Sequence, residues 1–231
     1  MTAVRALLSR KPATHDLPFA VDRPRLRGWV HAASVPGAVV IAVFLARAAS
    51  PGLPRVSAVA FGVALVALFA TSGTYHLWRW SSRVRYWLSR ADVAMIQLFI
   101  VASFTPVAVH TLSGAWKTWS LAVAWGVGII GAVVAASPIT GPKWLSVLGY
   151  TSTAALAIVP ITRIISALSW QGMALIALSV VLYLAGGVVY AQGRPNPWPG
   201  WFGFHEVFHV LVVLGGAVHV VAVWEHVLPL R

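Results

Sequence analysis

The chain of 231 residues has no cysteine and only five aspartates and glutamates. Without cysteine there are no disulfides, thiolate metal sites or cysteine nucleophiles, so a bound transition metal must take imidazole, carboxylate or water ligands. Charged residues make up 10% of the chain, and apolar residues make up 59%. This composition excludes a soluble globular protein and is typical of an integral membrane protein.

Positive charge dominates the few charged residues, because 17 lysines and arginines give a net charge of +12. In a soluble chain this excess would suggest a nucleic-acid partner. Here the basic residues lie mostly at the edges of apolar segments, where they set topology and contact anionic lipid headgroups. We therefore expect the lipid bilayer, and no nucleic acid, as a partner.

Apolar segments long enough to span a bilayer, about 20 residues each, recur along the chain. Seven of them lie at roughly 28–48, 56–78, 92–112, 118–137, 144–165, 170–190 and 204–227. Their short connections favour antiparallel neighbours. Prolines inside these segments are expected to kink the helices rather than end them, at Pro36, Pro106 and Pro160. The sequence thus predicts an all-α integral membrane protein with a seven-transmembrane helix bundle.

The domain organisation follows from the same pattern. Residues 1–27 carry six basic residues and no apolar stretch long enough for a signal-peptide core, so we expect a basic cytoplasmic N-terminal tail. Residues 28–231 form a single transmembrane domain. Twelve of the 17 basic residues lie in the tail and in the connections on its side of the membrane, which predicts a cytoplasmic N-terminus and an external C-terminus. The alanine-, valine- and arginine-rich composition indicates a bacterial source and an inner (plasma) membrane location.

The last apolar segment opens with His205-Glu206-Val207-Phe208-His209. Residues four apart on an α-helix lie on one face, about 5.4 Å apart along the axis, so both imidazoles can point at one ion. The predicted orientation places His76, at the end of the second segment, at the same end of the bundle. Asp92, which starts the third segment, lies there as well, and Ser72 lies one turn deeper than His76.

Ionisable groups inside a membrane span cost about 2.5–3.5 kcal/mol on insertion scales and usually mark a functional site. Three imidazoles and a water would give the open pattern of a catalytic zinc site. Asp92 could hold or deprotonate that water, and Ser72 could donate a hydrogen bond to it. Non-catalytic roles stay open: interfacial histidines, Asp92 as a partner of a helix dipole, and Ser72 bonded to its own helix carbonyl.

The remaining histidines are expected to play other roles. Interfacial or solvated positions are expected for His15, His31, His110 and His226. His219 lies deeper, ten residues past His209 and turned roughly 80° from it around the helix. We expect His219 to be packed and hydrogen-bonded.

The order of these motifs resembles a known family. It runs Ser72-Gly73-Thr74-Tyr75-His76, Asp92, Phe104-Thr105-Pro106, Arg194-Pro195-Asn196-Pro197 and Phe202 to His209. This order resembles the hemolysin III proteins, the bacterial branch of the progestin and adipoQ receptor family, which includes the adiponectin receptors. The likeness runs from the second segment to the seventh. Bacterial members commonly have Leu-Asp-His where this chain has Ala91-Asp92-Val93, so the aspartate is retained and the histidine after it is absent.

The resemblance implies a seven-helix fold with a cytoplasmic N-terminus and a Zn²⁺ near the inner membrane face. The family's three zinc-binding histidines match His76, His205 and His209, and the serine and aspartate that hold the zinc-bound water match Ser72 and Asp92. The resemblance also implies a lipid amide or ester hydrolase, similar to ceramidases, that acts on a membrane lipid in membrane lipid homeostasis.

Other functions stay open at this point. A non-enzymatic receptor or regulator with a structural zinc would use the same three ligands. An intramembrane metalloprotease also uses His-Glu-x-x-His, with the glutamate as general base. A bis-histidine haem protein needs single histidines that face one another across the bundle, whereas His205 and His209 share one helix face. The substrate and the oligomeric state leave no signal in the sequence.

Overall fold

The computed structural model describes residues 24–138 and 143–230. Most of the predicted tail 1–27, together with His15 and Arg231, therefore lies outside the described residues. Within the described ranges the regular elements are helices, and an isolated β-bridge joins Trp198 to Phe202. This architecture confirms the predicted all-α fold class.

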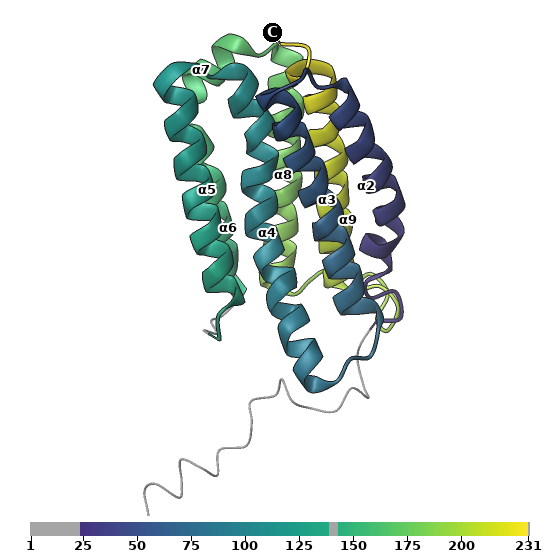
Figure 1. The fold of residues 1–231 in the computed structure, drawn as a ribbon. Coiled ribbons are helices and arrows are strands. Elements are labelled where there is room, and N and C mark those ends of the chain that lie inside the picture. Colours follow the sequence, from purple (N-terminus) through teal and green to yellow (C-terminus); the bar gives the residue numbers. More distant parts are fainter. Residues whose placement is uncertain (1–23, 139–142, 231) are drawn as a thin grey trace, which may run out of the picture.

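The long helices lie side by side as a bundle (Figure 1). In chain order the elements are α2 (Trp29–Ala48), α3 (Leu53–Leu77), α4 (Ser82–Thr111), α5 (Gly114–Ala136), α6 (Lys143–Ala155), the 3₁₀ turn η2 (Leu156–Ile158), α7 (Ile161–Ala167), α8 (Trp170–Gln192), α9 (Phe204–Ala222) and the π-helical turn η3 (Val223–Val227). Neighbours in sequence pack against one another in the pairs α2–α3, α3–α4, α4–α5 and α8–α9.

Length and composition make the chain an integral membrane protein. Among the described residues, six helices are long and apolar enough to cross a bilayer: α2, α3, α4, α5, α8 and α9 extended by η3. A further pair, Ser146–Ile158 and Ile161–Ala167, is bent by 59° and would make a seventh span if it crosses as one. The bend falls at Pro160, which has no N–H to donate and so interrupts the helical hydrogen bonds.

Helices α3 and α4 form the centre of the bundle. In the most apolar 18-residue stretch of each of these two helices, 56% is buried inside the bundle, against 39% for α9 and 17% for α2, α5 and α8. The peripheral helices expose valine, isoleucine and leucine, as expected for surfaces that face lipid. The core between α2, α3, α4 and α9 includes Leu45, Phe61, Leu65, Leu68, Phe99 and Ala108.

One end of the bundle collects the predicted site. Helix α3 ends there, and α2, α4 and α9 begin there, at the lower end of Figure 1. Antiparallel packing of α3 against α4 therefore brings residues around position 76 close to residues around position 92.

The start of α4 differs from the prediction. The helix begins at Ser82, ten residues before the predicted start at Asp92, and its first residues are largely exposed. Arginine is a good helix former, so the basic stretch continues the helix beyond the apolar segment. Asp92 therefore lies in the third turn rather than the first, and the helix-dipole explanation for this aspartate no longer applies.

Candidate metal centre

The beginning of α9 is fixed by Glu206. Its side chain is fully buried, and its Oε2 accepts a hydrogen bond of 2.8 Å from the backbone N–H of Gly203, the residue before the helix. The other oxygen, Oε1, is paired with the guanidinium of Arg27 from the segment before α2. This pair ties the two chain segments together and sets the first turn of α9, which carries His205.

His76 lies in the last turn of α3, close to the start of α2. Gly28 precedes α2 with φ of 85°, a conformation that L side chains rarely adopt. A Cβ on Gly28 would lie 2.7 Å from the Cβ of His76. Only glycine allows this close approach, which places the first turn of α2 directly against His76.

The three predicted zinc-binding histidines meet at one point. One ring nitrogen each from His76, His205 and His209 lies within 4.8 Å of the other two. The Nε2 atoms of His76 and His205 are 3.1 Å apart. Nitrogen ligands at about 2.0–2.1 Å from a tetrahedral zinc lie roughly 3.3 Å from one another, so the cluster has the spacing of a set that could hold a metal ion.

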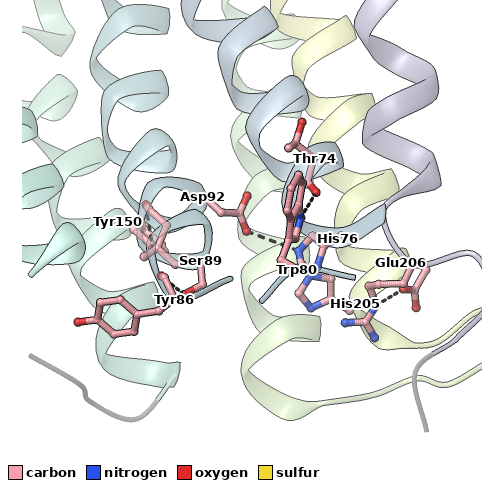
Figure 2. A network of polar contacts seen from close by, with 11 residues as sticks. Thr74, His76, Trp80, Tyr86, Ser89, Asp92, Tyr150, His205 and Glu206 are labelled. Atoms are coloured by element: carbon pink, nitrogen blue, oxygen red, sulfur yellow. Dashed lines mark hydrogen bonds and ion pairs between the residues drawn. The ribbon is translucent and has the colours of Figure 1, made fainter. Parts of the chain in front are cut away.

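Asp92 faces this cluster from α4. Its Oδ2 lies 3.5 Å from Nε2 of His76, and Figure 2 shows the carboxylate pointing at that imidazole beside His205. Ser72 lies one turn before His76 on α3 and is buried. Ser72, Asp92, His205 and His209 all line the same cavity. The structure thus brings together the five predicted site residues, although the roles of Ser72 and Asp92 stay predictions.

His31 contradicts the expectation of an interfacial or solvated role. The side chain is buried, with 3% of its surface exposed, because the first turns of α2 pack against α3 and α9. Its ring stacks on His209, with centroids 4.0 Å apart and an interplanar angle of 11°, and on Phe69, with centroids 5.0 Å apart. Among the described residues, neither ring nitrogen has a hydrogen-bond partner.

The other described histidines lie away from the cluster. His219 is buried, with Nδ1 3.2 Å from Oγ of Ser179 and Nε2 3.1 Å from the carbonyl of Ser103, which confirms the expected packed and hydrogen-bonded role. Two more make hydrogen bonds near the opposite end of the bundle: His110 with the Leu230 carbonyl and His226 with Oγ of Ser169.

A cavity of about 300 Å³ opens from the histidine cluster into the bundle. Its lining is mostly apolar and includes residues from every helix from α2 to α9, with two groups of polar residues at different levels of the bundle. The first group is Asp92, His205 and His209, and the second, further along α9, is Ser103, Ser179 and His219. A mostly apolar cavity with a few polar groups is the usual form of a small-molecule site.

The chain is similar to a family model and to two relatives from other organisms. A family model described as "Haemolysin-III related" matches residues 19–220, a range that contains all five predicted site residues. Heptahelical transmembrane protein ADIPOR2 of rice (Oryza sativa subsp. japonica) is 31% identical over 193 residues, covering 74% of this chain and 82% of the relative. Hemolysin-3 homolog of Bacillus subtilis (strain 168) is 25% identical over 184 residues, covering 80% and 83%.

Proposed function

Because the chain belongs to the haemolysin-III-related family, related to adiponectin receptors, we propose that it is a zinc-dependent hydrolase of membrane lipids. The substrate is a lipid with an amide or ester bond. One observation carries the proposal: His76, His205 and His209 converge next to Asp92 at the mouth of a largely apolar cavity. Three imidazole ligands with no thiolate leave the fourth coordination position of a zinc ion open. This is typical of catalytic zinc sites, whereas structural zinc sites have four protein ligands.

The residues fit zinc in ligand type and in spacing. Zinc bound by the three imidazoles would supply a Lewis acid that lowers the pKa of water to about 7 and polarises a carbonyl. Oδ2 of Asp92 accepts the proton of the attacking water and holds it for the leaving group. The hydroxyl of Ser72 orients the water or the substrate carbonyl by donating a hydrogen bond.

The cavity supports a lipid substrate. Its apolar wall binds the acyl chain, and its polar mouth binds the amide or ester group that is cleaved. The bound acyl chain thus holds the lipid carbonyl next to Asp92. Acyl chains are available in the bilayer around an integral membrane protein. This arrangement fits a role in membrane lipid homeostasis.

The topology belongs to the same proposal. The bent pair α6–α7 crosses the membrane as one span, which gives seven spans in the single domain 28–231. The excess of basic residues at the end with the histidine cluster makes that end cytoplasmic and the C-terminus external, in a bacterial inner membrane. The zinc site then lies just beneath the inner leaflet.

Glu206 distinguishes this proposal from an intramembrane metalloprotease. A protease of the His-Glu-x-x-His type needs this glutamate as a free general base beside the metal. Here one carboxylate oxygen is paired with Arg27 and the other accepts the N–H of Gly203. Glu206 therefore anchors the start of α9, and Asp92 is the carboxylate that faces the cluster.

The test is turnover by the purified protein in lipid nanodiscs. Amide- and ester-linked lipids are supplied with zinc, and released fatty acid is measured by mass spectrometry. We expect Asp92→Asn to abolish release while zinc remains bound. The matched control is Glu225→Gln, which changes an exposed carboxylate in η3, far along the chain from the cluster, and should keep full activity. Full activity in Asp92→Asn, or no release from any lipid by the wild type, would overturn the proposal.

A further inference from the structure

Further along the cavity from the histidine cluster lies a polar group that the proposed chemistry does not use. Tyr183 and Ser179 are four residues apart and share one face of α8. His219 of α9 and Ser103 of α4 complete the group, and all four residues line the cavity. The Tyr183 hydroxyl lies beside Gly216 of α9, 3.7 Å from the place that a Cβ on this glycine would take. Gly216 is seven positions past His209, which places the hydroxyl about 10.5 Å along the helix from the metal cluster.

The hydroxyl of Tyr183 has no hydrogen-bond partner among the described residues, although its oxygen is buried. The ring is held in place: it lies edge-on to Phe99, and a Cβ on Gly215 would come within 2.7 Å of its Cε1 atom. A buried, unsatisfied hydroxyl costs about 1–3 kcal/mol, and tyrosine hydroxyls that are buried usually find a partner. Phenylalanine would fill the same space without this cost. A tyrosine at this position therefore indicates that its hydroxyl donates a hydrogen bond to a ligand.

Ser179 adds an acceptor to this donor. Nε2 of His219 faces the carbonyl of Ser103, which only accepts, so Nε2 carries the proton and Nδ1 is an acceptor in the neutral ring. Oγ of Ser179 lies 3.2 Å from Nδ1 and 2.7 Å from the carbonyl of Ile176. Its single hydrogen serves only one of these two acceptors, and the lone pairs of Oγ remain available to accept a hydrogen bond.

We propose that Tyr183, Ser179 and His219 form a second binding subsite that recognises a hydroxyl group on the lipid chain. The inference rests on the proposed function, because it assumes that the lipid carbonyl lies at the metal cluster. A hydroxyl fits the subsite because it accepts the hydrogen bond of Tyr183 and donates to an acceptor such as Ser179. A separation of about 10.5 Å corresponds to roughly eight carbon–carbon bonds of about 1.5 Å each in an extended zigzag chain.

The substrate class that follows is an acyl lipid hydroxylated near carbon 9, counted from the carbonyl. A plain alkyl chain would leave the Tyr183 hydroxyl unsatisfied. A hydroxyl close to the carbonyl would lie at the metal end, outside the reach of Tyr183. The subsite thus selects the position of the hydroxyl as well as its presence.

The test compares three acids of equal length: dodecanoic, 3-hydroxydodecanoic and 9-hydroxydodecanoic acid. Their binding to the zinc-loaded full chain in detergent is measured by calorimetry for the wild type, Tyr183→Phe and Ser179→Ala. Comparing proteins for each acid cancels the different partition of the acids into micelles. The control is Tyr86→Phe, which changes an exposed tyrosine of α4 that does not line the cavity.

We expect Tyr183→Phe to weaken binding of the 9-hydroxy acid about three- to tenfold, the effect of one hydrogen bond, and to leave binding of the other two acids unchanged. Ser179→Ala should act in the same direction, and Tyr86→Phe should have no effect. If all three acids lose affinity equally, or none does, the hydroxyl has only a structural or a water partner and the subsite is refuted. If the wild type binds none of the acids, the lipid-binding proposal fails and this inference fails with it.

Discussion

The imidazole of His31 lies between the rings of Phe69 and His209, so its removal tests how the metal cluster is held. Each aromatic contact contributes about 0.5–1.5 kcal/mol beyond buried area, and the two stacks of His31 therefore contribute about 1–3 kcal/mol. Truncation also leaves a cavity beside His209, because the site is buried. We expect His31→Ala to lower the free energy of unfolding by at least this amount.

Loss of the stack also releases His209 from its orientation. Loss of a side chain that orients a metal ligand typically weakens metal affinity 10- to 100-fold. We expect the zinc affinity of His31→Ala to fall about tenfold, measured by competition with a chromogenic chelator. His31→Phe keeps both ring contacts and removes two buried nitrogens that have no hydrogen-bond partner among the described residues. Its zinc affinity should stay within about threefold of the wild type.

The control for this pair is His110→Ala, which removes an imidazole near the other end of the bundle and should leave zinc affinity unchanged. Wild-type affinity in His31→Ala would refute the stacking argument. An equal loss in His31→Phe and His31→Ala would also refute it, since the ring nitrogens rather than the ring faces would then matter.

Three further predictions follow from the packing. Asp92→Asn should retain one zinc per chain while lipid hydrolysis is lost, as metal analysis and turnover on the same sample would show; loss of the zinc would instead make Asp92 a ligand. Arg27→Ala leaves the buried Glu206 carboxylate without its counter-charge and should lower the free energy of unfolding by about 3 kcal/mol, the lower end of the 3–5 kcal/mol of a buried pair, because the arginine is partly exposed. A loss of less than about 1 kcal/mol, as for a surface pair, would contradict this prediction. Gly62→Ala places a Cβ 2.7 Å from a neighbouring helix and should cost about 1–3 kcal/mol, whereas Gly126→Ala meets nothing within 4 Å and should not destabilise.

The sequence was sufficient to predict which histidines converge. The spacing of His205 and His209 puts both on one helix face, and alternating spans bring the end of the second segment to the start of the seventh. These two arguments need only helix geometry and span order. The structure confirms the convergence, because the three ring nitrogens lie within 4.8 Å of one another.

Other features depend on how each helix is rotated about its axis and on which segments come close to one another, and hydrophobic periodicity specifies neither. His31 is a single imidazole in an apolar helix, and nothing in its own segment indicates that its face of α2 meets His209. The Arg27–Glu206 pair joins residues 179 positions apart. The His-Glu-x-x-His motif alone does not show which distant residue pairs with its glutamate. Hydropathy does not predict the early start of α4 at Ser82, because it marks where a span enters the membrane rather than where the helix begins.

The central claim is that His76, His205 and His209 together bind one zinc ion, and metal content tests it most directly. Elemental analysis of the purified wild type should find about one zinc per chain. His76→Ala and His209→Ala should each lose it, while His226→Ala, which removes a histidine hydrogen-bonded to Ser169, should keep it. Zinc contents of His76→Ala and His209→Ala equal to that of the wild type would contradict the account.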